Sequence, residues 1–215
     1  GVEALLSPTH LALLMSGLVA FSAPLRRSWV SSSPQPESLR AFLPVALSVT
    51  LLTTLVGFFL LYVSPFVNRA ASAAFERDPG VPHDHPARDP AELLQLLGIA
   101  SILVTTLLLA VAMTILLRRW HPPAGTFTLM LTTIVVLFVG LDEFAQAPLV
   151  VIGLVAGAAA DSAARRWPAP AVVGLTMLVL WASYFAVYQV AEGGVAWTAE
   201  LWSGVTVLSG LLGAA

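Results

Sequence analysis

The chain has 215 residues, of which 58% are hydrophobic and 10% are charged, and its formal net charge is −2. Because a soluble domain carries about 25% charged residues, this composition excludes an ordinary soluble protein, and the net charge gives no basis for nucleic-acid binding. The lack of cysteine and lysine excludes a disulfide, a thiolate metal site, an iron–sulfur cluster and a retinal Schiff base.

Long apolar segments separated by short charged clusters indicate an all-α, polytopic helical bundle in a membrane. About seven transmembrane helices are expected, at 8–25, 41–66, 93–117, 125–141, 148–164, 170–190 and from 197 onward. They form one transmembrane domain over 1–215, with an extracytoplasmic polar loop at 67–92. The chain starts at Gly1 and ends within an apolar run, so we expect an N-terminally truncated fragment of a longer protein.

Arginine pairs mark one side of the membrane, because each pair follows an odd-numbered span and Arg40 opens the second span. By the positive-inside rule this side is cytoplasmic, which places the N-terminus outside and predicts a multi-pass protein of the plasma (inner) membrane. A tryptophan next to each pair is expected to anchor the helix end in the interface. These residues are Arg26, Arg27, Trp29, Arg118, Arg119, Trp120, Arg165, Arg166 and Trp167.

Two of the expected spans are rich in small residues, which let neighbouring membrane helices approach closely. In the fifth span these include Gly153 and Gly157, and in the seventh they are Gly204, Gly210 and Gly213. We interpret both segments as helix-packing surfaces.

His10 is a candidate metal ligand at the start of the first span. Ser7 suits the N-cap position and Pro8 the first helical position, so His10 falls in the first turn. The positive end of the helix dipole disfavours the imidazolium there, and neutral imidazole is the form that binds metals. At the end of a helix, the alternative is a side chain that only caps the helix and contacts water.

His83 and His85 form a second candidate metal-binding pair, in the polar loop. They flank Asp84 and lie between Pro82 and Pro86, a setting that favours an extended backbone. In an extended segment the two imidazoles point to the same side and can chelate one copper, zinc or nickel ion. The alternative is a solvated loop without a ligand.

Asp161 is the main acid expected within a span. It precedes Arg165 by four residues, so an ion pair on one helix face is the structural interpretation, and a proton relay is the functional one. His121 follows Arg119 and Trp120 and is expected in the headgroup region.

Two further polar pairs lie at or near the predicted outer face. Asp142 and Glu143 end the fourth span, where carboxylates oppose the helix dipole; we expect a water-exposed cap, with another partner as the alternative. Tyr184 and Tyr188 are spaced by one helical turn, and they either face a pocket or belong to an aromatic belt.

The stretch Ser7-Pro8-Thr9-His10 at the start of a membrane helix resembles a Thr-Pro-Ser-His stretch in one of the membrane subunits of the particulate methane and ammonia monooxygenases. It is also similar to a broader set of bacterial membrane proteins with a Pro-x-His helix start. In the monooxygenase family the histidine is a copper ligand, joined by an aspartate and a histidine from a segment just upstream. The resemblance therefore implies copper binding at His10.

Only His10 carries over from this family, because the upstream ligands would precede Gly1. The family's later Asn and His motif has no match in the second span, where 57–62 offers no metal ligand. The resemblance spans roughly twenty of the 215 residues, and it implies metal binding more than monooxygenase activity.

Three functions are consistent with the sequence. The first is a membrane metalloprotein with an extracytoplasmic copper site at His10, acting as a subunit of a larger metalloenzyme or in copper handling. The second is a small-solute transporter, and the third is a structural or assembly subunit without chemistry of its own. Enzymatic activity is left open. The expected partners are the lipid bilayer and other membrane subunits. Bis-histidine haem is not expected, since His10 and His121 fall on opposite faces.

Overall fold

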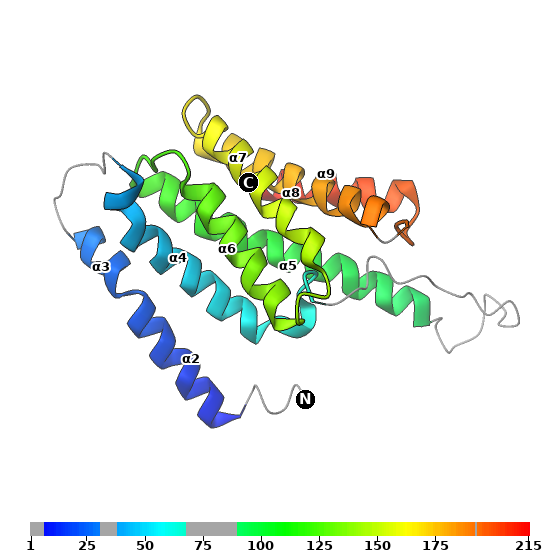
Figure 1. Cartoon of the computed structure of the whole chain (residues 1–215), viewed down its shortest axis with the longest axis horizontal. Helices are drawn as coiled ribbons and strands as arrows, with labels where there is room; N and C mark the ends of the chain where they lie inside the picture. The colour runs from blue at the N-terminus through cyan, green and yellow to red at the C-terminus, as the bar shows by residue number, and fades with distance from the viewer. Residues whose placement is uncertain (1–6, 31–37, 68–89, 192) are drawn as a thin grey trace, which may run out of the picture.

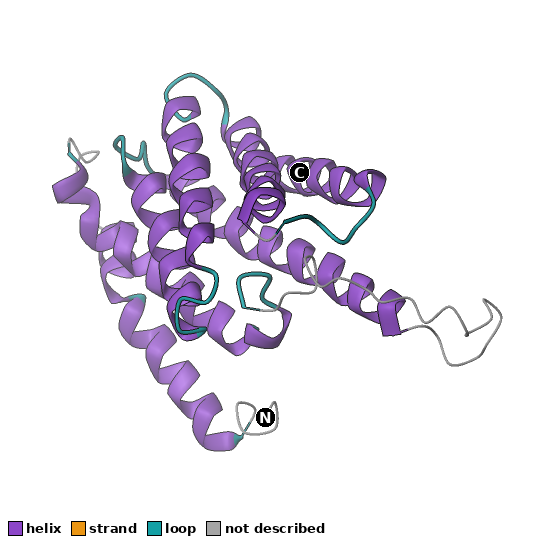
Figure 2. Cartoon of the chain, turned by 45° about the vertical axis from the view of Figure 1, so that its right-hand side comes forward, coloured by secondary structure: helices purple, strands orange, loops and turns teal. Residues whose placement is uncertain are grey.

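The structure, a computed structural model, describes residues 7–30, 38–67, 90–191 and 193–215, and every regular element in these ranges is a helix (Figures 1 and 2). This confirms the all-α fold class. The elements are α2 (Pro8–Phe21), α3 (Ala23–Val30), α4 (Leu39–Phe59), the 3₁₀ turn η1 (Leu61–Val63), α5 (Pro90–Arg119), α6 (Thr126–Leu141), the 3₁₀ turn η2 (Ala147–Leu149), α7 (Val150–Ala163), α8 (Ala169–Ala191) and α9 (Ala199–Ala214).

Four helical segments are long and apolar enough to cross a membrane: Pro8–Val30, Leu39–Phe59, Leu93–Arg119 and Ala169–Ala191. This supports the membrane class inferred from composition. Three shorter apolar helices, α6, α7 with η2, and α9, accompany them. At 1.5 Å per residue the 16 residues of α6 extend about 24 Å, less than the roughly 30 Å of a hydrocarbon core. The count of seven spans therefore stays a prediction.

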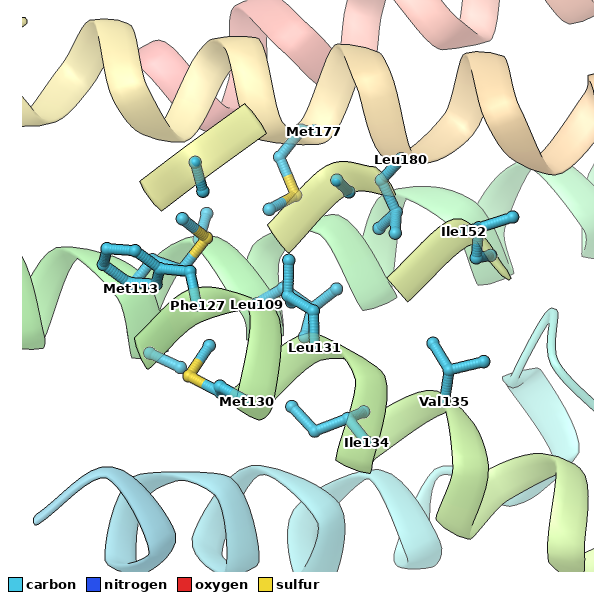
Figure 3. Packing of buried hydrophobic residues seen from close by; sticks show 14 of the residues in the cluster. Leu109, Met113, Phe127, Met130, Leu131, Ile134, Val135, Ile152, Met177 and Leu180 are labelled. Atoms are coloured by element: carbon cyan, nitrogen blue, oxygen red, sulfur yellow. The ribbon is translucent and has the colours of Figure 1, made fainter. Parts of the chain in front are cut away.

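The helices enclose one apolar core. Five helices form a closed ring in which each contacts the next, in the order α4, α6, α7, α8, α5 and back to α4. Helix α9 packs on α8 and α5. Side chains from α5, α6, α7 and α8 converge in the middle (Figure 3). They include Leu109, Met113, Phe127, Met130, Leu131, Ile134, Ile152, Met177 and Leu180, all at most 2% exposed.

Glycines allow two helix pairs to pack backbone against backbone, as the small-residue pattern predicted. A Cβ atom on Gly157 would lie 2.4 Å from Thr128 Cα, and one on Gly153 would lie 2.8 Å from Thr132 Cα. These contacts bring α7 against α6. In the α8–α9 pair the close backbone approach is at Gly174 of α8, where an added Cβ would lie 2.9 Å from the Gly210 carbonyl oxygen, whereas a Cβ on Gly213 would first meet the Met177 side chain, at 2.8 Å. Gly204 differs from the prediction, because the space beside it is open.

Helix α2 and helix α3 lie along the outside of the bundle, mainly against α4, and neither contains a buried residue. The break between them occurs at Ser22, just before Pro24, which cannot donate a helical hydrogen bond. Next to the break, the Val19 carbonyl accepts hydrogen bonds from Ser22 Oγ (3.0 Å) and from the Arg26 guanidinium (3.1 Å). The first span therefore continues as a bent helix to Val30, beyond the predicted end at 25.

The second span ends earlier than the predicted 41–66, because α4 stops at Phe59. A 3₁₀ turn and an irregular segment follow, and Ser64, Pro65 and Phe66 are buried. Pro65 has no N–H and disfavours the helical region for the preceding residue, and Ser64 is indeed extended, with ψ 122°. Non-helical backbone in a membrane bundle must find hydrogen-bond partners within the protein.

The arginines that lie in or directly after the described helices are all at one side of the bundle, which we call the arginine end (Figure 1). The ends of α3, α5 and α7 and the starts of α4, α6 and α8 lie there. Trp29 and Trp167 are about half exposed, as interfacial anchors would be. Trp120 differs from the prediction: it is 6% exposed, because it packs edge-on against Trp29 (ring centroids 5.4 Å apart) and Phe42 (6.0 Å).

Candidate functional site

His10 lies in the first turn of α2, as predicted, and is half-buried. Its Nδ1 atom is 2.8 Å from Ser7 Oγ, so the N-cap serine orients the imidazole instead of capping the helix backbone. Ordering of one ring nitrogen by a hydrogen bond is the usual arrangement around a metal-binding histidine. Copper binding at His10 stays a prediction.

The second predicted metal pair, His83 and His85, lies outside the described residues, as do Glu3 and Glu192. Within the described ranges no group of three or more His, Cys, Asp or Glu side chains is close enough to hold a metal ion. His121 is exposed next to the arginine end, where a headgroup contact was predicted.

The largest buried polar cluster of the described residues lies at the end opposite the arginines and centres on Gln146, which is 2% exposed. The Gln146 amide nitrogen donates to the carbonyl oxygens of Phe66 (3.1 Å) and Val67 (3.4 Å). The Gln146 amide oxygen accepts a hydrogen bond from the Tyr188 hydroxyl. One side chain thus connects α8 to the irregular segment after α4.

Tyr184, one turn before Tyr188 on α8, completes this cluster. Its hydroxyl donates to the Pro65 carbonyl oxygen at 3.0 Å, and its ring packs edge-on against Tyr188, with centroids 4.7 Å apart. Both tyrosines are at most 2% exposed, so they pack in the interior of the bundle; neither lines one of the pockets described below, and a buried pair does not fit the aromatic-belt alternative. Gln146 and Tyr184 together supply hydrogen-bond donors to the carbonyls of Pro65, Phe66 and Val67 in the irregular segment after η1.

A small cavity adjoins the irregular segment on the α4 and α5 side. Its volume is about 20 Å³, and hydroxyl-bearing residues Thr53, Ser64 and Thr105 are among its lining. A cavity of this size has room for about one water molecule, although most of its lining is apolar. It is too small for an organic substrate.

The turn that carries Gln146 has an unusual backbone. Glu143 and Phe144 both have positive φ, 52° and 61°, a conformation that costs a residue with a side chain about 1 kcal/mol or more. The Phe144 N–H is bonded to the Val139 carbonyl oxygen at 2.9 Å, closing the end of α6. Asp142 is the C-cap residue of α6 and is half-buried, and Glu143 is exposed. This agrees with the predicted water-exposed cap.

Sequence reasoning missed Gln146 altogether. The available signal is an uncharged amide placed between apolar residues, immediately before Ala147-Pro148. Such a residue in a short membrane connection either faces water or bonds inside the bundle, and nothing local distinguishes the two.

Asp161 occupies a different role from the predicted ion pair with Arg165. Its Oδ1 atom accepts the Phe127 N–H (3.0 Å), and its Oδ2 atom accepts the Thr128 N–H (3.0 Å) and the Thr128 hydroxyl (2.7 Å). Because the N-cap of α6 is Gly125, which has no side chain, α7 supplies the capping carboxylate. A negative charge at a helix N-terminus is stabilised by the N–H groups and the helix dipole.

We expect Asp161→Ala to lower the unfolding free energy by about 2 kcal/mol, as loss of a strong helix cap does. Asp161→Asn should cost about 1 kcal/mol, since the amide keeps one acceptor oxygen. Arg165→Ala should stay within about 0.5 kcal/mol, the usual range for an exposed position. Unfolding of the purified variants in mixed micelles measures all three. Equal losses for Asp161→Ala and Arg165→Ala would restore the ion pair as the main interaction.

A groove runs along the outer surface of α6 and α7, next to this cap. Its volume is about 560 Å³. Hydroxyls and the cap carboxylate give it a partly polar lining, which consists of Gly125, Thr128, Leu129, Thr132, Thr133, Leu154, Ala158, Asp161 and Ser162.

No protein-family model matches the chain, and neither a curated protein nor a solved structure shows significant similarity to it. The resemblance of Ser7–His10 to the monooxygenase membrane protein therefore stays a prediction.

Proposed function

We propose that this protein is a seven-span integral membrane subunit with a structural or assembly role, inserted in the plasma (inner) membrane with its arginine end in the cytoplasm. A transmembrane helix of a different subunit binds in the groove between α6 and α7. The observation that carries this proposal is a large groove on the outer surface of the bundle whose mostly apolar lining contains several hydroxyl groups and a carboxylate.

We infer that the groove lies within the bilayer from its position relative to the arginines. Ala158, near its middle, lies seven residues before Arg165 on α7, a distance of about 10 Å along the helix. With Arg165 at the interface, the groove faces the cytoplasmic half of the hydrocarbon core.

A protein helix suits this groove better than lipid chains do. Hydrocarbon offers no hydrogen-bond partner to the groove hydroxyl of Thr132, which has no partner among the described residues, whereas Ser, Thr and backbone groups of a neighbouring helix do. The surface formed by Ala158 and its small neighbours also permits close helix approach. A subunit that holds a second membrane helix needs such a surface and no catalytic group.

Cysteine cross-linking tests the proposal cleanly, because the chain has no cysteine of its own. We expect Ala158→Cys, in native membranes, to form a defined adduct with a short thiol cross-linker. Val111→Cys is the matched control: it is exposed on α5 and also lies seven residues before an arginine pair. The control should give no defined adduct at the same depth.

A second substitution shows whether the adduct needs the groove itself. Ser162→Trp fills the groove beside Asp161 and should abolish the Ala158→Cys adduct while the protein still inserts. Equal cross-linking at Ala158 and Val111 would contradict a specific interface. An adduct at twice the chain mass of 22.6 kDa would show a homo-oligomer in place of a different subunit.

A further inference from the structure

Five arginines from three helices gather at one corner of the arginine end, which we call the arginine corner: Arg26 and Arg27 on α3, Arg40 at the start of α4, and Arg118 and Arg119 at the end of α5. The helices meet here, since α3 packs on α4 and the Arg119 guanidinium donates to the Trp29 carbonyl oxygen at 3.2 Å.

The carboxylates with described positions lie elsewhere. Asp161 is bonded to the start of α6, and the others are at the opposite end, after α6 and on α9: Asp142, Glu143 and Glu200. Glu37, in the segment outside the described ranges, is the one acid that the sequence places between α3 and α4. The arginine corner therefore carries a large excess of positive charge.

Two of the five guanidinium groups interact with other described residues. Arg26 bonds to the Val19 carbonyl oxygen, and Arg119 lies over the rings of Trp29 (6.0 Å) and Trp120 (5.5 Å). Within the same part of the chain, Arg27, Arg40 and Arg118 have neither an ion-pair nor a hydrogen-bond partner. Such guanidiniums at headgroup depth suit bidentate contacts with phosphate.

An open pocket on α3 combines these charges with apolar surface. Its volume is about 490 Å³, and it is lined by Ala23, Arg26, Arg27 and Val30. Val30 is 85% exposed, and the exposed side chains of Val19 and Met15, at one-turn intervals before Ala23, continue the apolar surface along the same face of α2. Because α3 turns away from α2 at Ser22, the cations and this apolar strip meet at the bend.

We propose that the arginine corner binds an anionic phospholipid, with its phosphate on Arg27 and neighbouring guanidiniums and an acyl chain along the outer face of α2. A ligand with one anionic group and one long apolar chain matches both parts of the pocket. An acidic protein segment would match only the charges. This site is separate from the α6–α7 groove and does not depend on the partner subunit.

Native mass spectrometry of the purified protein in an equimolar mixture of phosphatidylglycerol and phosphatidylcholine tests the site. The wild type should retain phosphatidylglycerol preferentially. Arg27→Gln should lower that preference about fivefold, the effect expected for one cation near an anionic lipid surface. The control is Arg166→Gln, an exposed arginine at the same end but outside the pocket, which should leave the preference unchanged.

Two further measurements separate lipid binding from unfolding and from binding of free phosphate. The thermal unfolding midpoint of Arg27→Gln should match that of the wild type. A loss of bound lipid in this variant then cannot be attributed to unfolding. Millimolar inorganic phosphate should not displace the lipid, because phosphate lacks the acyl contact. The proposal is overturned by equal retention of both lipids in the wild type, by an equal loss in Arg166→Gln, or by displacement with inorganic phosphate. Binding of an acidic peptide without any lipid preference would also overturn it.

Discussion

Gly157→Ala should lower the unfolding free energy by about 2–3 kcal/mol, a large effect for a single methyl group. The added Cβ would lie 2.4 Å from Thr128 Cα and 2.7 Å from Thr128 N. Both atoms belong to the backbone of α6, so a rotamer change cannot relieve the overlap. The helices must separate, and the Thr128 N–H then moves away from the Asp161 carboxylate that accepts it.

Gly204→Ala provides the matched control, because an added Cβ there meets only open space. The same substitution in α9 should be neutral or stabilising by up to about 1 kcal/mol, the helix-propensity difference between glycine and alanine. Reversible unfolding in mixed micelles measures both variants. Similar losses for the two would mean that α6 and α7 are not in backbone contact in the membrane.

Gln146→Leu should cost about 3 kcal/mol, because it leaves two buried groups, the Tyr188 hydroxyl and the Phe66 carbonyl, without the hydrogen bonds that Gln146 gives them. The leucine side chain is of similar size, so the cavity contribution is small. Besides unfolding, hydrogen exchange reports this change locally: amides of 61–67 should exchange faster, while those of α9 should not.

Tyr188→Phe separates the contributions within this cluster. It removes one hydroxyl, leaves the Gln146 amide nitrogen bonded to the Phe66 carbonyl, and should cost about 1 kcal/mol. A loss in Gln146→Leu no larger than that in Tyr188→Phe would show that the segment after α4 holds its shape without Gln146.

The helices were predictable because their signals are local. Apolar segments separated by arginine pairs located α5, α6, α7 and α8 to within about three residues at each end, since hydrophobic length and charge placement decide where a membrane helix starts and stops. Pro65 indicates that the helix cannot continue to Phe66. The apolar run up to Phe66 nevertheless led to a predicted span that is longer than α4. The small residues of the fifth span also predicted the close packing of α7.

The polar contacts were not predictable because their partners are distant in sequence. Asp161 has an arginine one turn away that offers a plausible ion pair, and only the packing of α7 on α6 shows that the carboxylate instead reaches Thr128. Gln146 bonds to residues about 80 positions earlier. Trp120 follows an arginine pair as an anchor would, yet α3 and α4 cover it.

The cap that Asp161 provides for α6 has a consequence for how the chain enters the membrane. The N–H groups of Phe127 and Thr128 bond to a residue 33 or 34 positions later, so this acceptor is missing until α7 has been synthesised. Free N–H groups are costly in hydrocarbon. We therefore expect helices α6 and α7 to become stable together, as a hairpin.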